Sequence, residues 1–230
     1  MNYLLSVSLV ALTLTAGAPL DVVAQSPAMQ QGVSVQMPVT SNAASMPDAD
    51  KGDARIVTVT ESGRFYFGIS PVSSDALAEK IKGSLSNRDQ KLYIKADART
   101  PYANVEEVLE AAHRAGVATP ILLTAQAESP QPGTLVSPKG LEVLFVAPSG
   151  SQPTVVQVIK SGQQEPALRI NNRQIPWANL QNMLTQLFQN RSEQLVLVKA
   201  DGQLPFGQIV NVIDASRSTG AKVVLAAPQL

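Results

Sequence analysis

The 230-residue chain carries 18 basic and 18 acidic side chains, so its formal net charge is zero, and charged residues make up only 16% of it. A neutral chain with 4% aromatic residues and no stripe of basic residues is not expected to bind nucleic acid. The absence of cysteine excludes disulfides, thiol catalysis and cysteine-bound zinc.

Residues 1–24 are predicted to be an export signal. Tyr3–Leu20 is apolar apart from scattered Ser and Thr, and Val22–Ala24 offers small residues before a cut at Gln25. Cleavage is therefore expected near Ala24. The alternative is an uncleaved membrane anchor, because the apolar run is about the minimum length that spans a bilayer.

Residues 25–54 are predicted to form a disordered linker. They are rich in Ser, Ala, Pro, Gln and Met and show no sustained apolar period. The acidic run with Asp48, Asp50 and Asp53 lacks the glycine and the distal Glu that a calcium-binding loop needs at fixed offsets. It is interpreted as a solvated linker.

Two stretches of the remaining chain repeat each other without a gap. Lys91–Ala125 aligns with Leu195–Gln229, and Asp97 meets Asp201, 104 positions later. A match at one fixed shift indicates an internal duplication. Other pairs at the same shift are Lys95 with Lys199, Pro101 with Pro205, Tyr102 with Phe206, Val105 with Ile209, Leu109 with Ile213, and Gly116 with Gly220.

Each copy is predicted to be a strand, a helix and a second strand. Pro101 and Pro205 suit the first turn of a helix, where the missing amide would be unbonded. Gly116 and Gly220 are placed to end each helix in a left-handed cap. Such a crossover normally gives parallel, right-handed strand pairing. The apolar stripe runs through Val105, Val108, Leu109 and Ala112, and through Ile209, Val212, Ile213 and Ser216.

A hairpin and a helix are predicted ahead of each copy. Each unit is therefore β-β-α-β-α-β, and the chain is predicted to be α+β, with domains at 55–125 and 139–230 and a linker at 126–138. The hairpin strands are Ile56–Thr60 with Phe65–Ile69, and Val155–Ile159 with Ala167–Ile170; the helices are marked by Leu77, Ile81 and Leu85, and by Leu180, Leu184 and Phe188.

An extra strand is predicted at Gly140–Val146, which is apolar, aromatic and β-prone. As an added strand it would bury Leu141, Val143 and Phe145 on one side and cover an open edge. We therefore take these three residues as the candidate partner-binding strand and as the seam at which the two repeats pair within the chain. The alternative is two independent domains on a flexible linker.

The pattern resembles the periplasmic domain of the ExbD/TolR biopolymer-transport family. The resemblance rests on IKAD with PYANVEEVLEAAHRAG, on VKAD with PFGQIVNVIDASRSTG, and on SPKGLEVLFVAP, which looks like the segment leading into that domain. It implies two tandem domains of this type, each a small mixed sheet with two helices. Family members carry an aspartate followed by a long apolar run, whereas Asp21 follows its apolar run.

By this resemblance the chain would be a periplasmic, non-enzymatic interaction module. Its partners would be envelope proteins of a TonB/Tol-type system, or peptidoglycan. The alternative is a membrane-anchored subunit of a proton-driven transport complex, which requires that the amino-terminal segment stays uncleaved.

No residue set in the sequence predicts catalysis or a cofactor. Asp97 and Asp201 each end a strand ahead of a helix, where holding loop amides is the expected role. His113 is the single histidine and aligns with Arg217, which indicates a solvated helix face. One histidine without cysteine supplies no ordinary triad or metal cluster. The repeated Asp97, Pro101, Gly116, Asp201, Pro205 and Gly220 are interpreted as structural.

Overall fold

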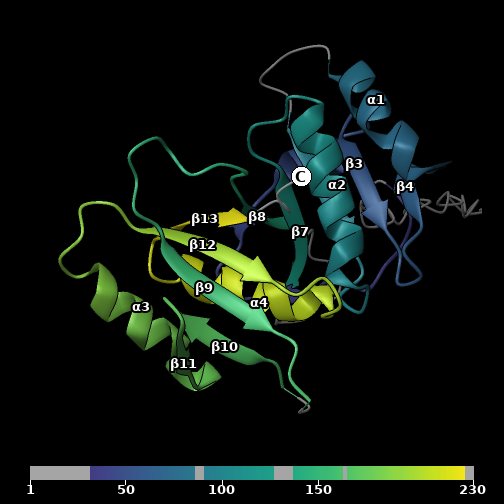
Figure 1. Cartoon of the computed structure of the whole chain (residues 1–230). Coiled ribbons are helices and arrows are strands. Elements are labelled where there is room, and N and C mark those ends of the chain that lie inside the picture. Colours follow the sequence, from purple (N-terminus) through teal and green to yellow (C-terminus); the bar gives the residue numbers. More distant parts are fainter. Residues whose placement is uncertain (1–31, 86–90, 127–136, 163–164, 226–230) are drawn as a thin grey trace, which may run out of the picture.

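The computed structural model describes residues 32–85, 91–126, 137–162 and 165–225. These ranges hold two β-sheets and four α-helices, an α+β arrangement in which each sheet carries two helices (Figure 1). The predicted signal or anchor at residues 1–24 and most of the linker at 126–138 lie outside the described residues. None of the described helices is long and apolar enough to cross a membrane.

The first repeat contains the hairpin, helices and strands that the sequence predicts, together with one further short strand. Its elements are β3 (Arg55–Val59), β4 (Phe65–Phe67), β5 (Ser70–Val72), α1 (Ser74–Ser84), β6 (Leu92–Ala96), α2 (Tyr102–Arg114) and β7 (Ile121–Gln126). Its strands lie in the order β5-β4-β3-β6-β7, parallel from β3 to β7 and antiparallel from β3 to β5.

The second repeat has the same order of elements and the same sheet. It comprises β9 (Thr154–Ile159), β10 (Ala167–Ile170), β11 (Arg173–Ile175), η2 (Trp177–Asn179), α3 (Leu180–Phe188), β12 (Leu195–Ala200), α4 (Phe206–Arg217) and β13 (Lys222–Leu225). The strand order β11-β10-β9-β12-β13 matches that of the first repeat. The extra strand β11 follows a tight turn, in which Asn171 and Asn172 have φ of 47° and 69°.

The helices α2 and α4 bury the predicted apolar stripe and end as predicted. Gly116 and Gly220 have φ of 88° and 83°, the left-handed conformation that a glycine adopts at low cost after a helix. Both helices begin one residue later than predicted. Pro101 and Pro205 lie just before them in extended conformation, with ψ of 137° and 132°. The reason is a contact between the repeats, described below.

The amino-terminal segment differs from the predicted disordered linker at 25–54. Residues 32–54, here called the arm, contain β1 (Val39–Thr40), β2 (Ala44–Ser45) and η1 (Pro47–Asp50). Met46 and Ala49 of the arm are buried against Ile56 and Tyr93 of the first sheet. This face of the sheet is apolar and lies opposite the helices, so covering it removes apolar surface from water.

The strand β8 (Lys139–Glu142) pairs antiparallel with β7 and so belongs to the first sheet. The boundary predicted at residue 139 assigns this strand to the second repeat. Because β8 instead extends the sheet of the first repeat, it links the two repeats. One continuous cluster of buried side chains contains residues of both repeats, so the repeats share a core.

Candidate functional site

The two repeats meet through the loops that precede α2 and α4. Pro101 and Pro205 face each other as an antiparallel bridge. Four backbone hydrogen bonds flank the prolines, and all four cross from one repeat to the other. Tyr102 N donates to Leu204 O (2.8 Å), Ala103 N to Gly202 O (2.9 Å), Phe206 N to Thr100 O (2.9 Å) and Gly207 N to Ala98 O (2.8 Å).

These hydrogen bonds are reciprocal. Each donor and acceptor has its counterpart 104 positions away, so the contact repeats itself with the roles of the two units exchanged. The donors are the first amides of α2 and α4, which have no partner within their own helix. Neither helix has a side-chain cap. Each repeat therefore caps the second helix of the other, which explains why the prolines adopt extended rather than helical backbone.

The contact between residues 98–103 and 202–207, which we call the seam from here on, requires small residues on both sides. A Cβ atom on Gly207 would lie 3.2 Å from Ala98 O and 3.3 Å from Ala98 Cβ. A Cβ atom on Gly202 would lie 3.1 Å from Ala103 Cβ. A glycine thus faces an alanine in both places, and a larger side chain would push the loops apart.

The predicted strand with Leu141, Val143 and Phe145 joins the two repeats at a separate place, between β7 and β13. Leu141, Val143 and Phe145 are 1%, 0% and 8% exposed. Beyond β8, Leu144 N donates to Val223 O and Leu225 N donates to Leu144 O, both at 2.9 Å, so the segment reaches the edge of the second sheet. In the structure this strand pairs with strands of its own chain. These hydrogen bonds join the two repeats, which confirms the prediction that the repeats pair within the chain.

The arm makes a second contact between the repeats. Ser41 N and Asn42 N donate to the carboxylate of Asp214 in α4 at 3.0 and 2.8 Å. On the other side, the ring of Phe145 lies 5.2 Å from that of His113 in α2. Sequence reasoning missed Asp214, because its partners come from a segment without a periodic pattern. Each leading segment thus contacts the second helix of the opposite repeat.

Asp97 and Asp201 both hold loop amides, but to different extents. Asp97 is buried and accepts hydrogen bonds from Gln36 N (3.1 Å), Arg99 N (3.1 Å) and the Arg99 guanidinium (2.9 and 3.0 Å). The Arg99 side chain, more than any other neighbour, holds the pKa of Asp97 below its usual value. Asp201 accepts one amide, Gln203 N, at 2.9 Å.

Glu106 is an acidic residue whose pKa is changed at the seam, and no sequence pattern singles it out. It projects from α2 toward the loop of the other repeat, where a Cβ atom on Gly202 would lie 3.3 Å from Glu106 Oε2. Burial, with repulsion from Glu110 and Asp201, raises the pKa of Glu106 to about 7. Near neutral pH the chain therefore holds a half-buried carboxyl group that gains or loses its proton at the junction.

This carboxyl group gives a testable pH dependence. The folded chain keeps the Glu106 proton at pH values where the unfolded chain has released it, so the free energy of unfolding falls as the pH rises from about 4.5 to about 7. Glu106→Gln should be more stable than the parent at pH 8, by roughly 1–2 kcal/mol after allowance for solvent screening, and should lose this advantage at pH 4.5.

Urea unfolding of both chains at the two pH values measures this difference. Glu79→Gln, at an exposed position of α1, is the matched control and should show no pH-dependent gain. A gain in the control equal to that of Glu106→Gln would show that the seam does not perturb Glu106.

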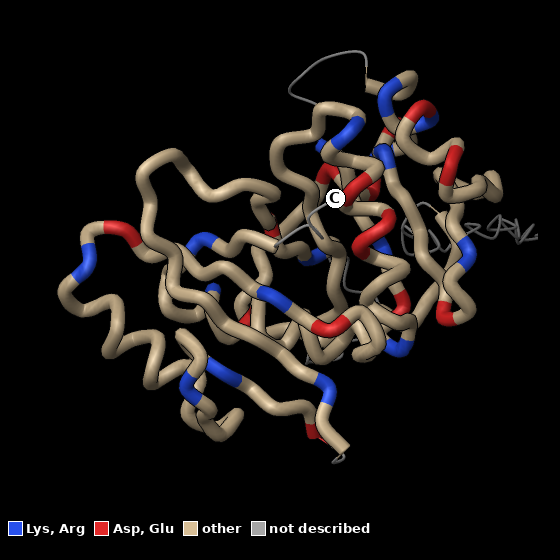
Figure 2. The backbone as a smooth tube through the Cα atoms, in the orientation of Figure 1, with Lys and Arg blue, Asp and Glu red and all other residues tan. Residues whose placement is uncertain are grey.

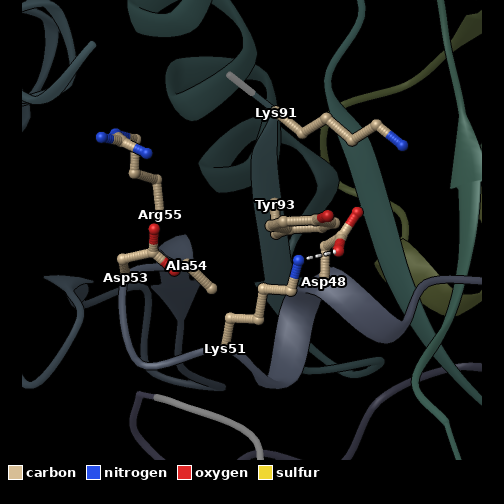
Figure 3. Close-up of a pocket in the computed structure, with 7 residues that line it drawn as sticks. All are labelled: Asp48, Lys51, Asp53, Ala54, Arg55, Lys91 and Tyr93. Carbon is tan, nitrogen blue, oxygen red and sulfur yellow. Dashed lines mark ion pairs between the residues drawn. The ribbon is translucent and has the colours of Figure 1, made fainter. Parts of the chain in front are cut away.

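A pocket of about 200 Å³ opens where the arm meets the first sheet (Figure 3). Lys51 Nζ lies 2.6 Å from Asp48 Oδ1, and this contact lowers the pKa of Asp48. Arg55 Nε donates to Ser84 O. Side chains of both charge signs line the pocket, so it does not select strongly for an anion or a cation. The lining residues are Asp48, Lys51, Asp53, Ala54, Arg55, Lys91 and Tyr93.

The single histidine lies in the first repeat and the single tryptophan in the second. His113 is exposed on α2, and Trp177 Nε1 donates to Pro166 O at 2.8 Å, which fixes the indole against the hairpin. Within the described ranges, no group of acidic residues and histidine is placed to hold a metal ion. The features that stand out are therefore interfaces: the seam, the arm and the faces of the sheets.

Comparison with known proteins gives one family. The model of the family described as Biopolymer transport protein ExbD/TolR matches residues 22–128 and, a second time, residues 127–229. The two matches correspond to the two repeats, each with its leading segment. No curated protein sequence matches the chain.

Proposed function

Because the chain belongs to the ExbD/TolR family of biopolymer transport proteins, we propose that it is a non-enzymatic interaction module of the cell envelope. It would act in the periplasm and bind envelope proteins of a TonB/Tol-type system, or peptidoglycan. Membership of the family supports a role related to biopolymer transport. The particular partner is part of the proposal.

The observation that carries this proposal is the fusion of two family domains into one paired unit. The reciprocal hydrogen bonds between residues 98–103 and 202–207 join the domains without a second chain. A covalent link raises the effective concentration of one domain around the other to roughly millimolar, so that even a modest interface stays closed. The result is a preassembled pair of domains whose outer surfaces stay available to partners.

We expect the mature chain to be exported and released by cleavage near Ala24. The family match begins at residue 22, so the apolar run at residues 3–20 is not part of it. Mass spectrometry of the protein recovered from fractionated cells should find Gln25 at the amino terminus and the chain in the periplasmic fraction. A chain that keeps Met1 and sediments with the inner membrane would support the anchored transport subunit instead.

The partner itself can be sought with the mature chain as bait. Cross-linking in an envelope extract, followed by affinity capture, should recover a Tol- or Ton-type envelope protein, or sedimentation with purified peptidoglycan should deplete the chain from solution. A chain with a disrupted seam, Gly207→Leu, serves as the control because it alters the pairing and leaves the sequence otherwise intact. Recovery of neither partner class would contradict the proposal.

A further inference from the structure

The two repeats differ in what covers the face of the sheet that lies opposite the helices. Thr58 pairs with Lys95 in the first sheet, and Gln157 pairs with Lys199 at the equivalent place in the second. In the first sheet Thr58 and Lys95 are 0% and 6% exposed. In the second, Gln157 is half-buried and Lys199 is exposed.

The apolar neighbours show the same difference. Ile56 and Tyr93 of the first sheet are buried, whereas their counterparts Val155 and Leu197 are only half-buried. The same surface is therefore closed in one repeat and partly open in the other. We call the outward side of β9, β10 and β12, with Val155, Gln157, Arg169, Leu197 and Lys199, the open face.

The arm closes this face in the first repeat. Met46 and Ala49 supply the apolar cover, and Lys95 is 6% exposed, so that burial lowers the pKa of its amine and the charge of Asp50 offsets this only in part. The covering segment is thus short, has two small or flexible apolar side chains, and carries the acidic residues Asp48 and Asp50.

The segment that leads into the second repeat cannot serve in the same way, because its backbone is used elsewhere. Its strand β8 is hydrogen-bonded to β7, and Leu144 is hydrogen-bonded to the edge strand β13. The open face therefore keeps a lysine, Lys199, at the position of Lys95 but is not covered by a segment like residues 46–50.

The charge on the open face fits an acidic occupant. Alternation along the strands places Arg169, Lys199 and Lys222 on the outward side, and the outward positions of β9–β13 in the described chain include no acidic residue. Figure 2 shows the basic positions on the strands of this sheet. These three residues form no ion pair within the described ranges, and positive charge beside half-buried apolar side chains favours a ligand that is both acidic and apolar.

We infer that the open face binds a short acidic segment of a partner protein, with apolar side chains spaced like those of Met46–Asp50. The segment would place its apolar residues on Val155 and Leu197 and its carboxylate near Lys199. This inference rests on the proposed function as an interaction module and specifies the chemistry of one partner segment.

A fluorescein-labelled peptide with the sequence of residues 43–54 is the probe, because it carries the chemistry that the equivalent face already accepts. Fluorescence anisotropy with the mature chain should show saturable binding that weakens as salt is added. Lys199→Glu and Arg169→Glu should each weaken binding at least about tenfold, because each replaces attraction by repulsion. Circular dichroism verifies that both variants stay folded.

Arg173→Glu is the matched control. Arg173 is an exposed basic residue of the same sheet, but it pairs with the buried Ile170 and so lies on the helix side. Its replacement should leave binding unchanged. Equal binding of a scrambled peptide, or binding that neither Lys199→Glu nor Arg169→Glu weakens, would overturn the inference.

Two further measurements identify the occupant of the open face. If the parent chain dimerises in sedimentation equilibrium and Lys199→Glu abolishes the dimer, the occupant is a second copy and the inference is wrong. If the chain captures an envelope partner but does not bind the peptide, the inference fails while the proposed function stands. Capture that Lys199→Glu weakens, together with peptide binding, supports both.

Discussion

Gly207→Leu is expected to lower the free energy of unfolding by about 1–3 kcal/mol and to open the seam between the repeats. The added side chain would start 3.2–3.3 Å from Ala98, where backbone oxygen and Cβ leave no room. Relief of the clash requires the loops to separate, which removes the cross-repeat hydrogen bonds of Gly207 and Phe206. Urea unfolding measures the stability, and hydrogen exchange of the Tyr102 and Ala103 amides reports whether the reciprocal bonds persist.

Gly83→Leu is the matched control for this prediction. Gly83 also lies in a helix, α1, but a Cβ atom there meets nothing within 4 Å. Leucine has a higher helix propensity than glycine, so the control should be unchanged or more stable by up to about 1 kcal/mol. Equal losses in the two variants would mean that the seam is not closely packed at Gly207.

Asp97→Asn is expected to cost about 2 kcal/mol at pH 7, because hydrogen bonds to a buried charged group contribute more than neutral ones. The amide nitrogen of asparagine cannot accept from Gln36 N or from the Arg99 guanidinium as the carboxylate does. The pKa of Asp97 is lowered in the folded chain, so its contribution is present above the usual value and is lost as the pH falls through the folded value. Thermal unfolding at pH 7 and pH 3 checks both statements.

Asp201→Asn is the internal control, since Asp201 occupies the same place in the second repeat. Its side chain accepts, among the described residues, only Gln203 N, and it is not fully buried, so its replacement should cost about 1 kcal/mol or less. If the two changes lower the free energy of unfolding equally, the hydrogen bonds of Asp97 to Gln36 and Arg99 do not add to stability. The aspartate would then stabilise both repeats only through what the two motifs share.

The elements with a clear period were predictable from the sequence. The apolar stripes of α2 and α4 and the glycines that end them follow local rules, and the structure places all of them as expected. The fixed shift of 104 positions also revealed the duplication. The short strands β5 and β11 were missed, because three residues are too few to show an alternation.

The arm and the seam are harder to predict from the sequence, because their contacts are with residues far away along the chain. Gln36 O and Pro38 O accept hydrogen bonds from Ala98 N and Ala125 N, residues that lie far along the chain. Met46 and Ala49 fit no helix or strand period, although they are buried. Glu106 likewise looks like any acidic residue on a helix face until the loop at Asp201 closes over it.

The alternation of alanine and glycine at the seam sets which halves can pair. In a symmetric dimer of identical domains, a substitution at the interface is present on both sides of the two-fold axis. When the two domains are fused in one chain, a substitution can change one side of the interface alone. Ala98 and Ala103 of the first repeat each face a glycine of the second. Two first repeats from different molecules would oppose alanine to alanine at both points, and two second repeats would leave glycine against glycine. The complementary fit therefore favours the pairing of a first repeat with a second repeat over the pairing of two identical repeats.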